Sequence, residues 1–399
     1  MRRMHNHPDD ICPAPTKLSA PPPQPLAPPL YAASVYPCES PAHADAVFSG
    51  AVSGYAYQRD GHPNADLLAE KCRQLHRAPR GVIAASGMAA MSVAMLSQLQ
   101  AGDHVIVSRH LYGRSLQLLT QEAARIGIHS TVVDTCDLDQ TTAAIRPATR
   151  LLVVETIANP LLRVADIPSL AEVAHASQAL LLVDNTFATP VLCRPLELGA
   201  DLVLESLSKM MNGHSDVILG LLCGREAVWQ RVPLVLSAWG LASSPFDCWL
   251  TWRGLATLSL RFQRAADNAL HAAQFLAGRS EVASVDYPGL PNHADHQLAC
   301  RQFTGQFGAM VTFHLAGGRP AAEQFMAAAN QIPFCPSLGE VSTTLSHPES
   351  TSHRSLTPDE RASLGIGGGA IRLSVGCESR EFVLEALAEG LAGLSSASR

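Results

Sequence analysis

The sequence predicts an α/β fold, in which a doubly wound domain with a parallel-rich central sheet is followed by a smaller α+β domain. Between about residues 65 and 235, short apolar runs alternate with segments of helical periodicity. The runs at 104–108, 151–155 and 179–184 are mostly apolar, which is typical of strands buried on both faces of a parallel sheet. Hydrophobic residues make up 47% of the chain and charged residues 16%, so a sizeable core is expected.

The composition narrows the classes of partner. The 399 residues carry a net charge of −6 without a long basic cluster, so we expect no nucleic-acid partner. No apolar run approaches the roughly 20 residues that span a bilayer, so we expect no membrane segment. The ten cysteines are scattered and form no CxxC pair. We therefore expect free thiols, a reducing cytoplasmic setting and no metal site.

The N-terminal part differs from the rest of the chain. Residues 1–30 are rich in proline and lack hydrophobic periodicity, which predicts a disordered arm. Further on, Tyr55, Tyr57 and Arg59 alternate with small or polar residues within 49–64. Taken alone, this pattern indicates an ordinary surface loop.

The α/β domain, expected over 65–244, begins with a candidate anion site. A helical pattern at about 66–76 precedes the apolar run VIAA, and a helix rich in Ala and Met follows Ser86-Gly87-Met88. The backbone N–H groups and the dipole at such a helix start attract anions. Glycine also lets the backbone approach a phosphate closely. Gly87 and Met88 are therefore candidate phosphate-binding residues.

Polar side chains follow two later strands of the predicted sheet. The pattern predicts a helix over 115–127, a strand over 129–134 and a later helix capped by Asp166. The run ALLLVD that follows ends at Asp184. The next run, DLVLES, ends in a polar cluster that contains Ser206, Ser208 and Lys209. Ligands of open α/β sheets bind outside the carboxyl ends of the strands, so these residues are candidates for chemistry.

The C-terminal part mixes both kinds of element. Residues 245–278 have a long helical pattern that could link two domains. Residues 279–399 combine apolar runs at 309–315 and 371–375 with helical segments. We expect a linking helix and then a smaller α+β domain.

Lys209 is a candidate covalent nucleophile. A lysine that forms a Schiff base must lose its proton or meet an existing aldehyde, and pyridoxal phosphate (PLP) supplies that aldehyde. The phosphate would need the N–H groups and hydroxyls of Gly87, Met88, Ser206 and Ser208. The pyridine nitrogen needs a carboxylate, for which Asp184 is placed. Tyr112, at a strand-to-helix turn, offers an aromatic face for the ring.

Five segments over about residues 54–390 resemble the Cys/Met metabolism PLP-dependent enzymes, the trans-sulfuration family of the cystathionine γ-lyase and γ-synthase type. They are ETIANPLLRVADI, LLLVDNTFATP, LELGADLVLESLSKMMNGHSD, SPFDCWLTWRGLATLSLR and IRLSVGCES. The resemblance implies an aspartate aminotransferase-like fold (fold type I) and a Schiff base between PLP and Lys209. It also implies an amino acid as substrate.

The resemblance implies a role for each matching residue. Lys209 would also shuttle protons, and Tyr112 would stack on the ring and help to activate the substrate. Asp184 would pair with the pyridine nitrogen, and Asn159 would lie near the ring hydroxyl. The phosphate would be held by Gly87, Met88, Ser206 and Ser208, and the substrate carboxylate by Arg372, Ser337 and Ser352.

The resemblance also reverses the reading of the loop at 49–64. Tyr57 and Arg59 would reach the phosphate of a neighbouring subunit, so that residues 31–64 form an arm that contacts this subunit. The implied assembly is a homodimer that pairs into a homotetramer.

Several positions depart from the family pattern. Gln117 stands where γ-synthases and γ-lyases often carry arginine, and Pro336 where they often carry glutamate. Arg114 stands where methionine γ-lyases tend to have cysteine, and His62-Pro63-Asn64 replaces Asn-Pro-Thr. Arg114 is either a receptor for an anionic distal group of the substrate or a solvated side chain.

The expected function is γ-elimination or γ-replacement on a sulfur-containing or O-acyl-homoserine amino acid. Ser337-Leu338-Gly339 resembles the γ enzymes, whereas β-lyases usually carry tryptophan at the place of Leu338. One alternative is a cystathionine β-lyase or a methionine γ-lyase-like carbon–sulfur lyase. Another is a catalytically silent family member that serves as a partner protein.

Overall fold

The computed structural model describes residues 25–354 and 357–396. The chain divides into a unit of residues 1–30 and a unit of residues 31–399. In the first unit, residues 25–30 form neither helix nor strand, and the expectation of disorder over 1–24 lies outside the described residues. Everything below concerns the second unit. No helix in the described part is both long and apolar enough to cross a bilayer.

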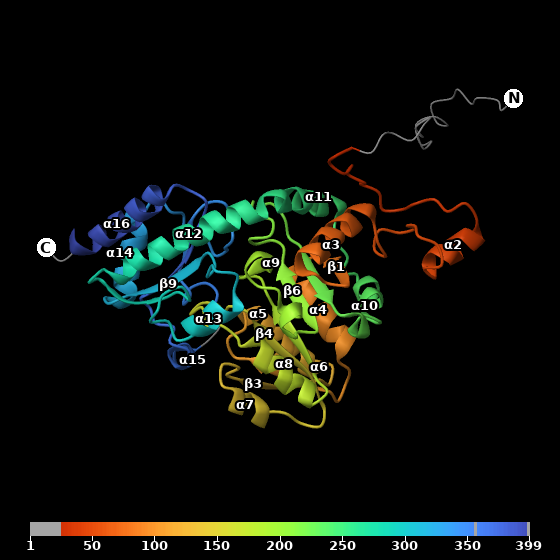
Figure 1. The fold of residues 1–399 in the computed structure, drawn as a ribbon, viewed down its shortest axis with the longest axis horizontal. Coiled ribbons are helices and arrows are strands. Elements are labelled where there is room, and N and C mark those ends of the chain that lie inside the picture. Colours follow the sequence, from red (N-terminus) through yellow and green to blue (C-terminus); the bar gives the residue numbers. More distant parts are fainter. Residues whose placement is uncertain (1–24, 355–356, 397–399) are drawn as a thin grey trace. The chain divides into compact units, whose positions relative to one another are not determined.

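A seven-stranded sheet forms the larger part of this unit (Figure 1). Its strand order is β1-β7-β6-β5-β4-β2-β3, and β7 is antiparallel to both of its neighbours while the other pairs are parallel. The parallel-rich sheet is therefore as predicted, and the antiparallel strand β7 was not predicted. The strands are β1 (Arg80–Ala84), β2 (His104–Ser108), β3 (His129–Val133), β4 (Thr149–Glu155), β5 (Leu180–Asp184), β6 (Leu202–Ser206) and β7 (Gly220–Gly224).

Helices cover both faces of this sheet because successive side chains of a strand point to opposite faces. Leu152 and Val154 of β4 share a core with α3, α8 and α12, whereas Leu151 and Val153 share a second core with α4 and α10. The helices of this part are α3 (Pro63–His76), α4 (Gly87–Gln98), α7 (Leu138–Ala143), α8 (Ile167–Ala176), α9 (Thr189–Leu192) and α10 (Val232–Ala238). Short 3₁₀ turns lie at η2 (Pro195–Leu198) and η3 (Glu226–Val228).

Two predicted helices are less regular than expected. The helix predicted over 115–127 consists of α5 (Gly113–Gln117), the π-helical turn η1 (Leu118–Glu122) and α6 (Ala123–Arg125). The helical stretch over 245–278 consists of α11 (Pro245–Gly254), the 3₁₀ turn η4 (Leu255–Thr257) and α12 (Leu258–Ala277). Residue 254 is a glycine, which weakens a helix interior.

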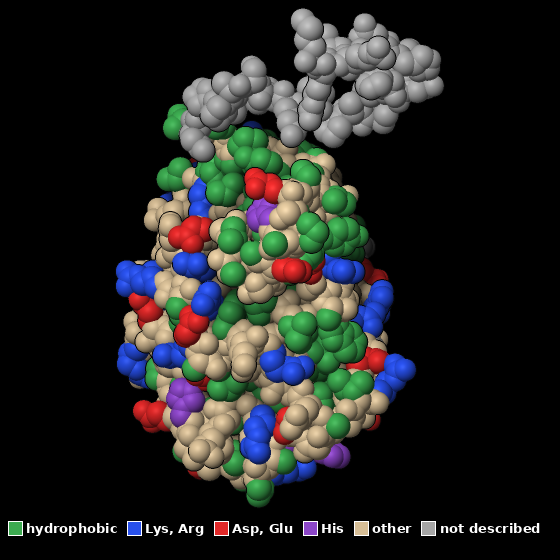
Figure 2. Space-filling view, turned by 90° about the vertical axis from the view of Figure 1, so that its right-hand side faces the viewer, with side chains coloured by type: hydrophobic (Ala, Val, Ile, Leu, Met, Phe, Trp, Pro, Cys, Tyr) green, Lys and Arg blue, Asp and Glu red, His purple; other side chains and the backbone are tan. Residues whose placement is uncertain are grey.

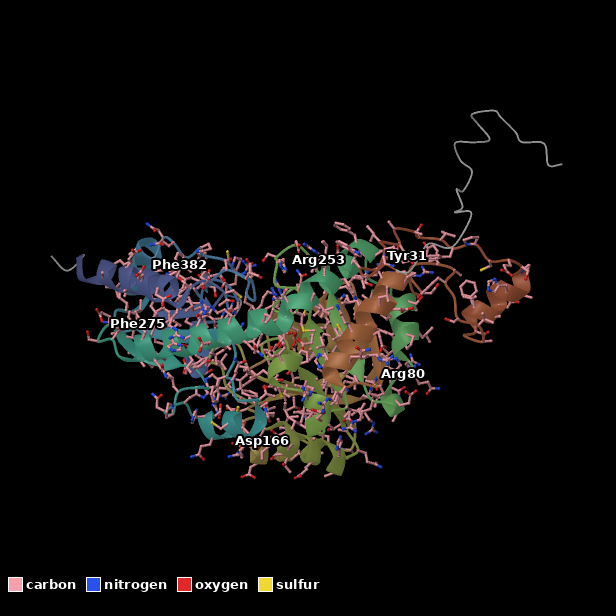
Figure 3. All side chains as sticks on the ribbon, turned by 45° about the horizontal axis from the view of Figure 1, so that its top comes forward. Tyr31, Arg80, Asp166, Arg253, Phe275 and Phe382 are labelled. Atoms are coloured by element: carbon pink, nitrogen blue, oxygen red, sulfur yellow. The ribbon has the colours of Figure 1, made fainter. Side chains whose placement is uncertain are left out.

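A four-stranded antiparallel sheet with the order β10-β11-β9-β8 forms the smaller part. Its core includes side chains of α12, α14 and α16, and Phe275 and Phe382 pack at its edge (Figure 3). The strands are β8 (Val282–Asp286), β9 (Met310–Leu315), β10 (Thr344–Ser346) and β11 (Ala370–Ser374). The helices are α13 (His296–Gln302), α14 (Gly318–Ala328), α15 (Pro358–Ser363) and α16 (Arg380–Ser396).

Residues 31–57 precede α3 as an arm that contains α2 (Pro41–Phe48), a helix without a buried residue. Ser40 caps this helix, since its side chain accepts from the His43 N–H at 3.1 Å. Tyr31 N–H donates to the Asn64 side chain at 2.8 Å. On the face drawn in Figure 2, acidic and basic side chains are interspersed rather than gathered by sign.

Candidate active site

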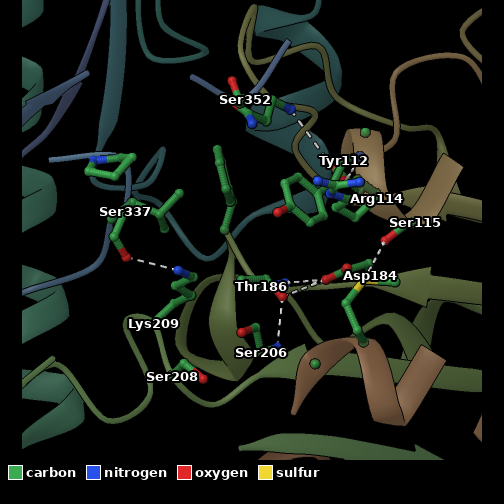
Figure 4. Close-up of a pocket in the computed structure, with 18 of the residues that line it drawn as sticks. Tyr112, Arg114, Ser115, Asp184, Thr186, Ser206, Ser208, Lys209, Ser337 and Ser352 are labelled. Atoms are coloured by element: carbon green, nitrogen blue, oxygen red, sulfur yellow. Dashed lines mark hydrogen bonds between the residues drawn. The ribbon is translucent and has the colours of Figure 1, made fainter. Parts of the chain in front are cut away.

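A cavity of about 560 Å³ lies at the carboxyl ends of β4, β5 and β6, and residues of the smaller sheet close its other side (Figure 4). Of the residues singled out from the sequence, the cavity is lined by Gly87, Met88, Tyr112, Arg114, Asn159, Asp184, Ser206, Ser208, Lys209, Ser337, Ser352 and Arg372. Tyr57 and Arg59 do not line it. Tyr57 is 43% exposed, and the Arg59 guanidinium lies 5.1 Å from the centre of its ring.

Lys209 lies in a turn directly after β6. Its N–H donates to the Ser206 carbonyl at 3.1 Å, and its own carbonyl accepts from the Gly213 N–H at 2.8 Å. The side-chain Nζ donates to Ser337 Oγ at 2.9 Å (Figure 4). Burial lowers the pKa of Lys209, the positive charge of Arg372 lowers it further, and Glu340 opposes both. A larger fraction of this amine is therefore neutral, and able to attack, than of a solvated lysine.

A close backbone approach brings Ser337 to the lysine turn. Gly339 has a φ of +84°, and a Cβ at this position would lie 2.5 Å from the Met210 backbone nitrogen. Its N–H donates to Ser374 Oγ of β11 at 2.8 Å. Only glycine combines this conformation with this contact, so the loop at 336–340 depends on it.

Asp184 ends β5 beside Glu155, which ends β4. Asp184 Oδ1 accepts from the Thr186 N–H at 3.0 Å and from Thr186 Oγ1 at 2.6 Å. Burial raises the pKa of Asp184 to about 6, although both hydrogen bonds from Thr186 oppose this. A bound cation beside Asp184 would favour its charged form.

Glu155 is a site residue that the sequence reasoning missed. Its two carboxyl oxygens accept from the N–H groups of Tyr112 at 2.6 Å and Asn159 at 3.2 Å. Burial and the charge of Asp184 raise its pKa well above the usual range, against these hydrogen bonds. Glu155 thus fixes the backbone of two predicted site residues. The sequence signal that could have identified Glu155 is its position at the end of an apolar strand, which is also the position of Asp184.

The start of α4 offers donors for an anion. Ser86 caps the helix by accepting from the Ala89 N–H at 3.0 Å. The N–H groups of Gly87 and Met88 belong to the first turn, which has no intrahelical acceptors. A Cβ on Gly87 would lie 3.0 Å from Ser206 Cβ, so glycine keeps this end of the cavity open. The Ser208 hydroxyl is engaged elsewhere, since it accepts from the Leu219 N–H at 3.1 Å.

Arg372 of β11 lies on the opposite side and is only 3% exposed. Its Nη1 donates to Asn159 Oδ1 at 2.8 Å and its Nη2 to the Ser337 carbonyl at 3.1 Å, while Nε has no partner in the described part of the chain. Burial lowers its pKa to about 10. Among the described residues this guanidinium forms no ion pair, so the site suits a carboxylate.

Two further arginines line the cavity. Arg114 Nη1 donates to the neutral Gln117 side chain at 2.7 Å. Arg354 is exposed and was not singled out from the sequence, although Ser352 of the same loop was. Ser352, two residues before Arg354, contacts His353 Nδ1 at 2.8 Å. Neither arginine forms an ion pair within the part of the chain that the structure describes.

A possible metal-ligating group lies outside the cavity, although none was expected. Ligand atoms of His110, Asp134 and Cys136 lie within 4.8 Å of one another. Asp134 already accepts from the Cys136 N–H at 3.0 Å, contacts His110 Nε2 at 3.1 Å and pairs with Arg109 at 3.2 Å. These contacts satisfy the carboxylate without a metal.

Known proteins resemble the chain over nearly its whole length. Residues 19–392 match the family described as Cys/Met metabolism PLP-dependent enzyme. An L-methionine gamma-lyase of Porphyromonas gingivalis is 38% identical, over 92% of this chain and 93% of the relative. An O-succinylhomoserine sulfhydrylase of Pseudomonas aeruginosa is 40% identical, over 92% and 90%. The crystal structure of cystathionine gamma synthase from Xanthomonas oryzae pv. oryzae in complex with cystathionine superposes with a TM-score of 0.88 at 37% identity, over 93% and 94%.

Proposed function

We propose that the substrate of this enzyme is an amino acid whose γ-substituent ends in a carboxylate. The chain belongs to the Cys/Met metabolism PLP-dependent enzymes. The chain is a PLP-dependent enzyme of the γ-elimination and γ-replacement kind. Bound PLP supplies an electron sink that acidifies the protons on the first carbons of the substrate. The cavity fits this cofactor, because it combines a lysine of lowered pKa, a buried carboxylate and a helix start left open by Gly87.

The residues that would hold the cofactor are those proposed from the sequence. Lys209 would bind it covalently, Asp184 would pair with the pyridine nitrogen, and Tyr112 would lie against the ring. The phosphate would be bound by Gly87, Met88 and Ser206, and by Ser208 if its hydroxyl turns away from Leu219. Asn159 would lie near the ring hydroxyl.

The residues that would act on the substrate lie on the other side of the cavity. Arg372 would bind the α-carboxylate with its two-pronged guanidinium, and Ser337 and Ser352 would contribute hydroxyls. Lys209, once released, would take the proton from the α-carbon and then move protons at the β-carbon, as γ-chemistry requires. Ser337 Oγ, which accepts from Nζ at 2.9 Å, would hold the amine in place between these steps.

The charge of the cavity is the observation that carries the proposed substrate class. Its carboxylates, Glu155 and Asp184, end adjacent strands at the cofactor side, whereas Arg114 and Arg354 line the cavity without a carboxylate partner among the described residues. A second carboxylate on the substrate would form ion pairs with these two arginines. The name of one relative, O-succinylhomoserine sulfhydrylase, includes a substrate of this kind.

The test compares kcat/KM for O-succinylhomoserine, O-acetylhomoserine and methionine in the wild type and in the double variant Arg114→Ala/Arg354→Ala. We expect the wild type to prefer the succinyl ester. The double variant should lose roughly tenfold or more on this ester, the scale of a hydrogen-bonded charge, and change little on the acetyl ester. Equal losses on both esters, or a wild-type preference for methionine, would contradict the proposed substrate class.

A homodimer that pairs into a tetramer, located in the cytoplasm, is part of the same proposal. Tyr57, Val35 and Phe48 of the arm are exposed apolar side chains that a second copy could cover. The nine cysteines in the described residues are free thiols, which suits a reducing compartment. Light scattering would measure the assembly.

A further inference from the structure

A buried acid–base pair lies behind the cofactor side of the cavity and has no part in the chemistry proposed above. His76 ends α3, and Glu205 is the residue of β6 that precedes Ser206. His76 Nε2 lies 3.3 Å from Glu205 Oε1, and both side chains are 0% exposed. Within the described residues, both His76 nitrogens and Glu205 Oε2 lack a hydrogen-bond partner. An unsatisfied buried group is costly, so the pair needs a reason to be there.

Glu205 connects to Asp184 through one intermediate residue. Asn185, directly after Asp184 and fully buried, donates from Nδ2 to Glu205 Oε1 at 3.0 Å and to the Cys193 carbonyl at 3.0 Å. Asn185 Oδ1 accepts from Thr156 Oγ1 at 2.6 Å. The Thr156 N–H in turn donates to the Asp184 carbonyl at 2.9 Å. Glu205 therefore orients an amide that ties the ends of β4, β5 and β6 together.

The surroundings of the pair disfavour charge. An ionised Glu205 would have a single amide donor, and its contact with His76 is too poorly aligned to count as a hydrogen bond. A buried charge with so little compensation takes up a proton instead. Burial raises the pKa of Glu205, opposed by the Asn185 hydrogen bond and reinforced by Asp184. Burial also lowers the pKa of His76 to about 3.

The other charged or titratable groups near the pair do not reverse this conclusion. Burial raises the pKa of the thiols of Cys72, Cys193 and Cys223, and the charge of Glu205 adds to the shift of each. Arg194 acts on His76 and further disfavours its protonation. These shifts favour a neutral acid beside a neutral imidazole over an ion pair at the 3.3 Å contact.

We propose that Glu205 is a positioning residue for Asp184. Glu205, as a neutral acid beside neutral His76, fixes Asn185 and the end of β5 and places no second negative charge behind Asp184. A protonated Glu205 carboxyl group suits this role because one of its oxygens can accept a hydrogen bond from the Asn185 amide while the group carries a proton. Asp184 then keeps both its position and its role as the anion on this side. The inference rests on the role proposed above for Asp184.

The first experiment is an infrared spectrum of the protein at neutral pH. We expect the wild type to show a carbonyl stretch of a protonated carboxyl group that Glu205→Gln removes, with or without PLP. The comparison isolates Glu205 from Glu155, because Glu155 is unchanged in the variant. A wild type that lacks this variant-sensitive band has an ionised Glu205, and the proposal would be wrong.

The second experiment measures PLP affinity and the pH at which the absorbance of bound PLP changes. Glu205→Gln, which mimics the neutral acid, should keep both properties. Glu205→Leu removes the acceptor for Asn185 and should weaken PLP binding about tenfold, the low end of the loss seen when a group that orients a ligand-binding residue is removed. Asn185→Ala breaks the same link and takes its place if Glu205→Leu does not fold. The proposal would be overturned if Glu205→Leu, or Asn185→Ala in its place, kept the wild-type PLP affinity and absorbance change. It would also be overturned if Glu205→Gln lost as much PLP affinity as that variant.

Asp184→Asn separates this inference from the role on which it rests. If this variant keeps wild-type PLP affinity and absorbance, the role proposed for Asp184 fails. The infrared band still reports directly on the protonation of Glu205. Thermal unfolding of each variant without PLP identifies losses that stem from stability alone.

Discussion

Glu155 and Asp184 stand directly opposite each other across the parallel ladder of β4 and β5, and both line the cavity. Burial raises the pKa of both carboxyl groups, and the charge of Asp184 adds to the shift of Glu155. Without a cationic ligand, the folded protein therefore holds protons here that the unfolded chain releases. A carboxyl pair of this kind makes the stability of the PLP-free protein depend on pH.

Asp184→Asn should reduce that dependence. The pKa of Asp184 rises from an ordinary 3.8 to about 6 on folding, so its neutral form stabilises the fold below the lower value. This contribution is lost as the pH rises through the higher value. The unfolding free energy of the wild type minus that of the variant should thus fall between about pH 4 and pH 6 and level off above. Urea unfolding of both PLP-free proteins measures it, and a difference that grows with pH would contradict the prediction.

Arg372→Gln should change both substrate binding and the pH profile. Loss of the buried guanidinium should raise KM roughly tenfold or more, the scale of a hydrogen bond to a charged group. The positive charge of Arg372 disfavours a proton on the Lys209 nitrogen, whether this nitrogen is free or bound to PLP, so its removal should move the acidic limb of kcat/KM to higher pH. Arg319→Gln, at an exposed ion pair with Glu323, is the matched control and should leave the profile unchanged. An unshifted limb in Arg372→Gln would show that this charge does not tune Lys209.

Gly339→Ala should impair the site as well as the fold. Alanine at a positive φ costs about 1–2 kcal/mol in any position, and at residue 339 its Cβ would also clash with the Met210 backbone. We expect Ser337 to be displaced from Lys209 and kcat to fall. Gly240→Ala is the matched control, because Gly240 has a φ of +68° with nothing within 4 Å of a Cβ. Equal losses of kcat in both variants would show that the close approach at Gly339 is not what positions Ser337.

Mixed subunits should reveal whether Tyr57 and Arg59 serve a neighbouring cavity. Neither residue lines the cavity of its own chain. Arg59→Ala and Lys209→Ala homomers should each be impaired, whereas a heteromer of the two would contain a site with wild-type Lys209 and a wild-type Arg59 from the other copy. We expect activity to appear on mixing and refolding the two variants. Mixtures no more active than the separate variants would place Arg59 outside the site.

The sequence predicted the parallel strands because burial on both faces leaves long apolar runs such as that ending at Asp184. It did not predict β7, since GLLCG is short, has glycine at both ends and follows a polar loop. The helix α2 was also missed, although Ser40 before Pro41 is a recognisable start signal. Its lack of a buried face left no hydrophobic period to detect.

The site residues on strand ends and in distinctive motifs could be proposed from the sequence, and the structure brings most of them into one cavity. The contacts between distant segments could not be predicted. His76 and Glu205, for example, meet only because α3 packs against the sheet, and no local pattern indicates that pairing. Arg354 was missed because its place on the cavity wall depends on how the loop after β10 returns across the site.

The antiparallel strand β7 has a consequence for the reactive lysine. Ser206 and Gly220 are paired across β6 and β7, so the segment between them is a hairpin loop whose two ends are pinned by the ladder. The ladder therefore holds the lysine backbone in place at both ends of this loop, and the backbone cannot follow the substrate from the α-carbon to the β-carbon. That reach must come from rotation about the four methylene groups of the side chain, which makes the length of the lysine arm as important as its basicity.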